Sequence, residues 1–255
     1  MRYTRAGDDD RAALRALWKQ AFGDGEAAID AFFGTLFPRC DAFAAREGED
    51  LCAMLFCLPQ TLVRAGCEEK AAYIYAVATD ERWRHRGACC GLLQYAEKKL
   101  KSRGVRLLML AALTPELGAM YEKLGFQGAS TTFSPQKLPA PQGRAEVVSA
   151  VDYAGLRETL LGDTPHIRYD KPTLEYAGQD DTFYLLDAPG TLGCAAVRKL
   201  PDGRLRADEL LPDARALPAL AAALDKPEIL LPEAGFYSRW LDGTPEAVYA
   251  AFALD

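Results

Sequence analysis

The sequence stretch that carries most structural information is Tyr73-Ile-Tyr-Ala-Val-Ala-Thr-Asp-Glu-Arg-Trp-Arg-His-Arg-Gly-Ala-Cys-Cys-Gly-Leu-Leu93. Its first seven residues favour a buried strand, and a run at helical spacing begins at Ala88. The basic turn between them contains Gly87, which lets the backbone approach a ligand without a side chain in the way. A strand that turns into a helix in this way directs several backbone N–H groups toward one point at the positive end of the helix dipole. The stretch therefore predicts an anion site, and a pyrophosphate is its natural ligand.

Four side chains add positive charge around this turn: Arg82, Arg84, His85 and Arg86. The turn is neither a Walker loop nor a dinucleotide-binding GxGxxG motif. A basic glycine turn alone more often marks only the start of a helix. The binding assignment therefore depends on a second motif further along the chain.

The composition is that of a folded protein. The chain has 255 residues, of which 49% are hydrophobic and 26% are charged, and these values exclude wholesale disorder. The length suits one large domain or two small ones. No uncharged apolar run approaches roughly 18 residues, so we expect no membrane span and no membrane partner. The first ten residues also lack the apolar stretch of a secretory signal.

The formal net charge of -6 is divided unevenly along the chain. Residues 1–140 contain 19 Lys and Arg against 17 Asp and Glu, whereas residues 141–255 contain 11 against 19. This difference favours two halves with different surfaces. Because no basic stripe dominates, nucleic acid is not an expected partner.

The cysteines and histidines exclude several kinds of site. The seven cysteines are an odd number without a CxxC pair, and only two histidines are present. We therefore expect no metal site and no disulfide framework, and the thiols favour a cytoplasmic location. Two histidines beside charged residues or proline give little support for a Ser-His-Asp triad.

The first half alternates predicted helices and strands. Helices are expected from about 11 to 22, from 26 to 37, from 88 to 102 and from 116 to 124, and strands at 42–46, 51–58, 61–63, 71–79, 105–112 and 126–133. The apolar run Val105–Ala112 is typical of a buried strand. Three prolines and a glycine between Ser134 and Gly143 then indicate a linker.

The second half repeats this order without obvious sequence identity. It is predicted to contain strands at 146–149, 182–186, 191–200, 204–211 and 227–231, and helices at 152–161 and 214–224. The predicted organisation is a first domain at 1–135, a linker at 136–143 and a second domain at 144–255. The fold class is α/β with a mixed sheet in each half.

Two motifs together resemble the GCN5-related N-acetyltransferase (GNAT) superfamily. The segment Arg84-His-Arg-Gly87-Ala-Cys89 is similar to its acetyl-CoA motif, Arg/Gln-x-x-Gly-x-Gly/Ala, with Cys89 as a minor departure. The segment Tyr121-Glu-Lys-Leu-Gly125-Phe126 is similar to the family's Tyr-x-x-x-Gly-Phe segment. The resemblance covers roughly residues 1–135 and implies the acyl-CoA N-acyltransferase fold.

The resemblance also implies site residues. The strand residues Val77, Ala78 and Thr79 are expected to offer backbone groups to the pantetheine arm and the thioester of acetyl-CoA. The pyrophosphate is expected among Arg84, His85, Arg86, Gly87, Ala88, Cys89 and Cys90. Tyr121 resembles the family's general acid, and a phenol with a pKa near 10 can protonate a leaving thiolate with a pKa near 8.5.

The division into two halves resembles the enhanced-intracellular-survival-type acetyltransferases, without their sterol-carrier-like domain. The second half lacks the glycine turn, because Pro212-Asp-Ala-Arg-Ala-Leu-Pro218 stands at the corresponding place. It is therefore predicted to be a degenerate GNAT-like domain that binds no CoA. The general base is left open between the carboxylate of Asp255, by analogy with those relatives, and a water chain. The loop carboxylates Asp80 and Glu81 are expected to be solvated.

These observations favour an N-acetyltransferase that transfers acetyl from acetyl-CoA directly to a primary amine of a small molecule or peptide. The alternatives are a non-catalytic acyl-CoA sensor or scaffold, and an interaction module whose acidic half binds a basic partner. The acidic half suggests a cationic acceptor, such as a polyamine, an aminoglycoside or a lysine side chain, although acidic residues also serve solubility. A homo-oligomer is left open.

Overall fold

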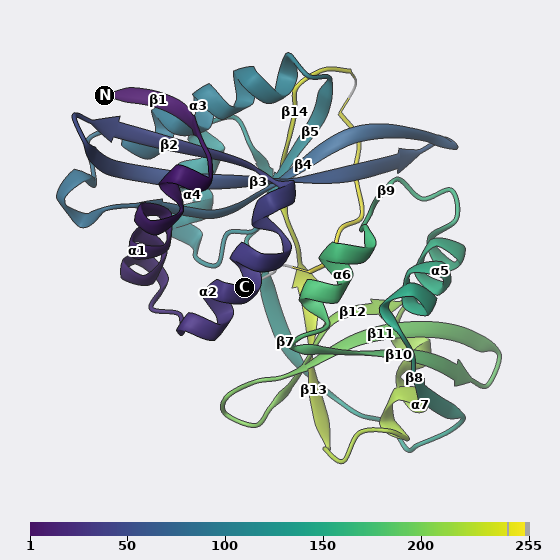
Figure 1. The fold of residues 1–255 in the computed structure, drawn as a ribbon. Coiled ribbons are helices and arrows are strands. Elements are labelled where there is room, and N and C mark those ends of the chain that lie inside the picture. Colours follow the sequence, from purple (N-terminus) through teal and green to yellow (C-terminus); the bar gives the residue numbers. More distant parts are fainter. Residues whose placement is uncertain (244, 253–255) are drawn as a thin grey trace.

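A computed structural model describes residues 1–243 and 245–252 of the chain as two mixed β-sheets with helices on their faces (Figure 1). The first sheet has the order β1-β2-β3-β4-β5-β14-β6, with β9 paired to β3. Its strands are β1 (Arg2–Ala6), β2 (Asp41–Glu47), β3 (Asp50–Arg64), β4 (Cys67–Thr79), β5 (Val105–Leu110), β6 (Gln127–Gly128), β9 (His166–Arg168) and β14 (Tyr237–Trp240). Only β4 and β5 pair in parallel among these strands as described.

Two pairs of helices cover the two faces of the first sheet. They are α1 (Arg11–Phe22) and α2 (Glu26–Thr35) on one face, and α3 (Ala88–Lys101) and α4 (Pro115–Lys123) on the other. Side chains alternate along each strand, so Met54 and Phe56 face α1 and α2, whereas Leu55 and Cys57 face α3. Helix α3 is amphipathic, and its apolar stripe includes Leu92 and Leu100.

The second sheet has the order β7-β13-β12-β11-β10-β8. Its strands are β7 (Thr132–Lys137), β8 (Arg144–Val147), β10 (Asp181–Ala188), β11 (Thr191–Lys199), β12 (Leu205–Leu211) and β13 (Glu228–Ala234). The helices beside it are α5 (Ala150–Leu161), α6 (Lys171–Ala177) and α7 (Leu217–Ala221). Helix α7 is much shorter than the predicted helix 214–224, because residues Ala214–Ala216 form a 3-10 turn before it and the helix ends at Ala221.

The two sheets exchange strands across the predicted linker. Strand β7, which includes Gln136 and Lys137 of that linker, pairs with β13 in the second sheet. Strand β14 returns from the end of the chain and pairs with β5 and β6 in the first sheet. The strand predicted at 126–133 is divided accordingly into β6 and β7. The sheets therefore do not separate at residues 136–143.

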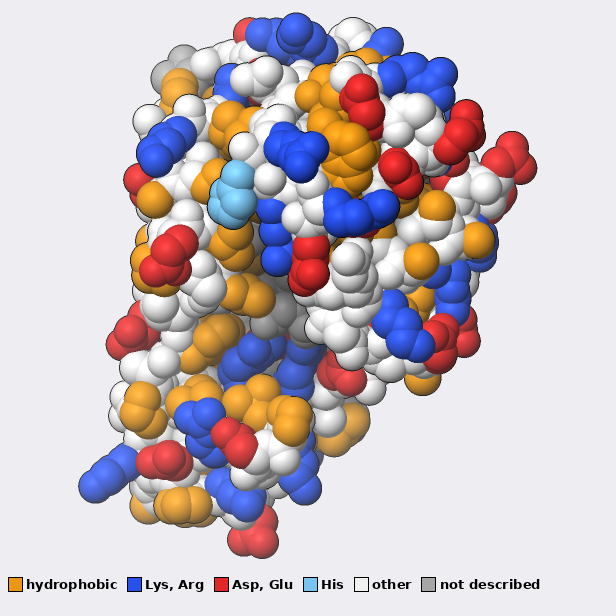
Figure 2. Space-filling view, turned by 90° about the vertical axis from the view of Figure 1, so that its left-hand side faces the viewer, with side chains coloured by type: hydrophobic (Ala, Val, Ile, Leu, Met, Phe, Trp, Pro, Cys, Tyr) orange, Lys and Arg blue, Asp and Glu red, His pale blue; other side chains and the backbone are white. Residues whose placement is uncertain are grey.

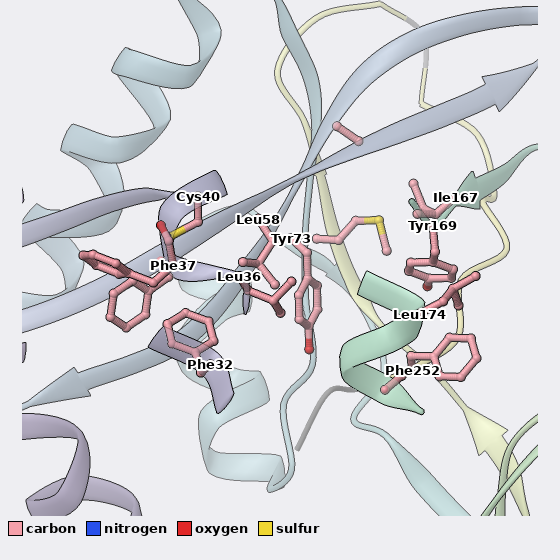
Figure 3. Packing of buried hydrophobic residues seen from close by; sticks show 14 of the residues in the cluster. Phe32, Leu36, Phe37, Cys40, Leu58, Tyr73, Ile167, Tyr169, Leu174 and Phe252 are labelled. Atoms are coloured by element: carbon pink, nitrogen blue, oxygen red, sulfur yellow. The ribbon is translucent and has the colours of Figure 1, made fainter. Parts of the chain in front are cut away.

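The two halves also share one hydrophobic core. Figure 3 shows Phe32, Leu36, Leu58 and Tyr73 of the first half in the same cluster as Ile167, Tyr169, Leu174 and Phe252. Ion pairs add to this contact, with 2.8 Å between Arg39 and Asp170 and 2.7 Å between Arg64 and Glu246. The predicted mixed α/β architecture agrees with this arrangement, and the two halves are joined by a shared hydrophobic cluster and by ion pairs.

Among the described α-helices and strands, four were not predicted from the sequence: β1, β9, α6 and β14. None of the described helices is long and apolar enough to cross a membrane.

Candidate active site

The candidate site begins where β4 separates from β5. The two strands pair in parallel only as far as Tyr73 and Met109, although β4 continues to Thr79. Residues Ala78 and Thr79 remain paired to β3 on the other side. Backbone groups of β4 that point away from β3 are therefore available to a ligand in the gap.

A β-bulge shapes the end of β4. Phe56 pairs with Tyr75 and Met54 pairs with Ala78, so β4 has two residues where β3 has only Leu55. Ala76 takes a left-handed conformation with φ of +47°. Such a bulge bends its strand and re-aims the residues that follow it, here those predicted to hold the thioester.

The basic turn after β4 presents N–H groups as predicted from the sequence. Gly87 forms the N-terminal cap of α3 at φ +77°, and His85 is also left-handed at +61°. The first backbone bond of the helix runs from the N–H of Gly91 to the carbonyl of Gly87, at 3.0 Å. The preceding N–H groups at the start of α3 have no partner of this kind within the helix, so they can bind an anion.

These elements enclose one cleft with a volume of about 480 Å³. Ten of the eleven predicted site residues line it: Val77, Ala78, Thr79, Arg84, His85, Gly87, Ala88, Cys89, Cys90 and Tyr121. The cleft therefore brings the strand end, the glycine turn and the candidate acid together.

Arg86 is the predicted residue that is not among the residues lining this cleft. Its guanidinium lies 5.2 Å from the ring centre of Trp83, in a cation–π contact. Arg84 lines the cleft and donates from Nε to the carbonyl of Thr79, at 3.4 Å. Its Nη1 also lies 3.7 Å from Glu81.

Tyr121 lies on α4 and is 5% exposed. Its ring packs against Phe126, with 5.9 Å between the ring centres. Burial raises the pKa of Tyr121 above its usual range, and the neighbouring Cys89 and Cys90 raise it further. The phenol therefore stays protonated and can serve as a proton donor.

The thiol of Cys89 is not activated as a nucleophile. A helix N-terminus normally lowers the pKa of a thiol. Here burial dominates and raises the pKa of Cys89 to about 12, with Cys90 adding to the effect. This thiol is not a nucleophile at neutral pH.

Of the two loop carboxylates expected to be solvated, Glu81 is exposed, whereas Asp80 is buried. Asp80 is 8% exposed and accepts hydrogen bonds from Arg82, at 2.9 Å from its backbone N–H and 3.0 Å from Nη2. Its pKa is lowered, chiefly by the side-chain hydrogen bond with Arg82. A carboxylate held in this way is a weak base. Asp255, which was left open as the base, lies outside the described residues.

The second half offers no comparable anion site at the corresponding turn. Before α7 stands Asp213, whose carboxylate accepts from the backbone N–H of Arg215 at 2.9 Å and from its Nη2 at 2.8 Å. The side-chain hydrogen bond with Arg215 lowers the pKa of Asp213 to about 2, so this carboxylate is charged. The carboxylate of Asp213 occupies the backbone N–H of Arg215, which a phosphate would need, and its negative charge repels a phosphate.

Five further residues line the cleft that sequence reasoning did not assign to it: Ala21, Phe22, Trp83, Leu117 and Met120. Phe22 is the last residue of α1, and its side chain is 45% exposed. Its position directly before Gly23-Asp-Gly25, where the helix ends, is the signal that could have indicated this. Among the residues that the structure describes, no three His, Cys, Asp or Glu side chains are grouped as a metal site would require.

Comparison with known proteins gives one family. The sequence profile of the family described as "Acetyltransferase (GNAT) domain" matches residues 2–129, about half of the chain. No curated protein matches the sequence. The chain therefore belongs to the GNAT acetyltransferase family, whose members use acetyl-CoA.

Solved structures with the same fold extend over both halves. A GCN5-related N-acetyltransferase from Kribbella flavida has a TM-score of 0.73 at 16% identity, covering 94% of this chain and 71% of that one. A probable N-acyltransferase from Enterococcus faecalis has a TM-score of 0.70 at 15% identity, with coverages of 94% and 72%. Eis1 from Mycobacterium abscessus has a TM-score of 0.64 at 15% identity, with coverages of 91% and 65%. The fold is thus a GNAT domain followed by a second GNAT-like domain, as in proteins of the Eis type.

Proposed function

We propose that this protein is an N-acetyltransferase that transfers the acetyl group of acetyl-CoA directly to a primary amine. The observation that carries the proposal is the cleft at the end of β4, which brings together the start of α3 and the buried phenol of Tyr121. In acetyl-CoA bound along this cleft, the pyrophosphate would lie at the start of α3 and the thioester at the end of β4. The leaving thiol would then lie near Tyr121.

The binding of acetyl-CoA is assigned as follows. The N–H groups at the start of α3 and the side chain of Arg84 hold the pyrophosphate, because both supply positive charge at the same end of the cleft. The backbone of Val77 to Thr79 holds the pantetheine arm and the thioester.

The transfer itself needs one base and one acid. The nitrogen of a neutral amine attacks the thioester carbonyl carbon and forms the C–N bond. The C–S bond then breaks, and Tyr121 gives its proton to the departing sulfur. The proton lost from the nitrogen returns to the phenolate through water, so the enzyme ends the cycle unchanged. The protonated thiol of Cys89 supports direct transfer over an acetyl-cysteine intermediate.

The test is thiol release from acetyl-CoA with a panel of primary amines. Tyr121→Phe should lower kcat by about 100-fold, the usual contribution of a general acid, while the affinity for acetyl-CoA stays within about twofold. Tyr95→Phe is the matched control, because Tyr95 stacks on Tyr3, outside the lining of the cleft. An unchanged kcat in Tyr121→Phe would show that the acid assignment is wrong.

The same assay separates the enzyme from an acyl-CoA sensor or scaffold. Turnover with any amine of the panel supports the enzyme. Micromolar binding of CoA with no thiol release from any amine would support the sensor instead.

A further inference from the structure

A second chamber adjoins the acetyl-CoA cleft and has a volume of about 320 Å³. Its lining consists of Trp18, Phe22, Asp24, Tyr73, Ile74, Tyr75, Ala76, Val77, Ala111, Leu113, Leu117 and Tyr121. Four of these residues, Phe22, Val77, Leu117 and Tyr121, also line the cleft. The chamber therefore opens onto the place where the thioester and the acid are assigned.

The chamber has an unusually apolar entrance. Phe22, Leu113 and Leu117 are 45%, 56% and 42% exposed, and they are among the few large hydrophobic side chains exposed in the described structure. Exposed apolar side chains gathered around one cavity mark a binding site. Figure 2 shows the face that carries α1, where hydrophobic side chains run down toward the hollow between the two halves.

Aromatic rings form the inner wall. The rings of Trp18 and Tyr75 are 5.7 Å apart, and those of Tyr73 and Tyr75 are 6.1 Å apart. Burial raises the pKa of Tyr75 well above its usual range, and the nearby Tyr176 adds to this, so its ring stays neutral. Neutral aromatic faces attract cations and apolar groups alike.

Asp24 is the one charged side chain among the described residues that line the chamber. Its Oδ2 accepts the indole N–H of Trp18, at 2.7 Å. Within the part of the chain that the structure describes, no Lys or Arg lies at ion-pair distance from Asp24. A lone carboxylate in an apolar, aromatic chamber attracts a cation more strongly than the same group in bulk water.

We propose that the acceptor is a primary amine carried by a ring or a comparable apolar body, and that Asp24 binds its ammonium group as it enters. The inference rests on the proposed function and names its substrate class. The apolar body packs against Phe22, Leu113 and Leu117, and the ammonium lies between Asp24 and the aromatic wall. The ammonium releases one proton to solvent water before its nitrogen attacks, and Asp24 remains a carboxylate throughout.

This class is favoured over the other amines considered from the sequence. A polyamine lacks an apolar body and would leave the exposed side chains at the entrance uncovered. An aminoglycoside carries many hydroxyl groups, whereas the described lining offers mainly carbon surface. A single carboxylate suits a single ammonium.

The test measures binding without turnover, so that it does not depend on catalysis. Calorimetry with the full chain saturated with CoA compares 2-phenylethylamine, 2-phenylethanol and spermidine. The amine should bind at least tenfold more tightly than the alcohol, which lacks the charge, and than spermidine, which lacks the ring. Equal affinity for the amine and the alcohol, or tighter binding of spermidine, would overturn the proposal.

Three variants locate the two contacts. Asp24→Asn keeps an oxygen that can accept the Trp18 hydrogen bond, and it should remove the advantage of the amine over the alcohol. Asp9→Asn, a substitution of an exposed carboxylate outside the chamber, should change nothing. Leu113→Asn should weaken the amine and the alcohol equally, by at least about threefold, without affecting CoA. If Asp24→Asn retains the full preference for the amine, Asp24 is not the ammonium site.

A steady-state assay then separates the two proposals. For 2-phenylethylamine, Asp24→Asn should raise KM by at least tenfold and leave kcat within about threefold. Charge-dependent binding without thiol release in the wild type would overturn the acetyltransferase and leave the amine site standing. Thiol release with an unchanged KM in Asp24→Asn would instead support the acetyltransferase and overturn the amine site at Asp24.

Discussion

Nε of Arg157 lies 2.9 Å from Oε1 of Glu209, and the two side chains are 1% and 0% exposed. Tyr153 donates a hydrogen bond to the same carboxylate, and Nη1 of Arg157 donates to the carbonyl of Ile167 at 2.7 Å. This buried ion pair therefore joins α5 to β12 and to β9, the strand that pairs with the first sheet.

Glu209→Ala should destabilise the protein by about 3–5 kcal/mol, because it leaves the charge of Arg157 buried without its partner. Urea denaturation followed by circular dichroism measures this free energy of unfolding. Glu175→Ala, which removes an exposed ion pair with Lys171, is the control and should cost less than about 1 kcal/mol. A similar small loss in both variants would contradict the importance of the buried pair.

Gly87→Glu should reduce the affinity for acetyl-CoA by at least about tenfold. The position is left-handed at φ +77°, and the new carboxylate would stand beside the N–H groups assigned to the pyrophosphate. Gly104→Glu is the matched control, since Gly104 is also left-handed, at +81°, and an added Cβ there meets no atom within 4 Å. Both variants carry the same backbone strain and charge change, so isothermal titration should show that only Gly87→Glu loses CoA.

The pH dependence of kcat should show no loss of the acid between about pH 8 and 10. A general acid acts only while protonated, and its contribution disappears as the pH rises through its pKa. Burial, followed by Cys89 and Cys90, raises the pKa of Tyr121 above the usual value near 10, so the descending limb moves to higher pH. A fall in kcat below pH 9 that is seen in the wild type and absent in Tyr121→Phe would show that Tyr121 loses its proton in that range, contrary to this prediction.

Cys89→Ser should keep kcat/KM for acetyl-CoA within about threefold. Burial raises the pKa of this thiol to about 12, so it holds no thiolate to lose at neutral pH. Steady-state thiol release measures the effect, and mass spectrometry of the wild type mixed with acetyl-CoA should find no acetyl group on Cys89. A loss of activity near 100-fold, together with a trapped acetyl-cysteine, would establish a covalent mechanism instead.

A fragment of residues 1–143 should not fold into a stable domain. It lacks β14, which pairs with β5 from Leu107 to Leu110, and it lacks the second-half side chains of the shared core. An unpaired β5 exposes backbone groups and apolar surface. Near-ultraviolet circular dichroism of the fragment should lack the aromatic signal of the full chain, and a native-like spectrum with cooperative melting would contradict the expectation.

The sequence was most informative where structure depends on neighbours along the chain. The turn from Arg84 to Cys90 and the helix start at Gly87 are local, and the sequence pattern predicted both. The outward position of Arg86 depends on the ring of Trp83, which sequence spacing does not indicate.

Long-range pairing was the part that the sequence could not predict. The four residues of β14 and the three of β9 are too short to show a period of two, and their partners lie about 100 residues or more away. The chamber around Asp24 was missed for the same reason. It joins the end of α1 to β4 and α4, and it exists only when these elements meet.

The place of β14 also determines when the first sheet can be completed during synthesis of the chain. Tyr121 is the last of the cleft residues to be translated. The strand β14, which pairs with β5, follows more than 100 residues later. At 5–20 residues per second this interval is roughly 5–20 s. Throughout that time the nascent first half exposes the edge of β5, and the ribosome must release most of the chain before the first sheet is complete.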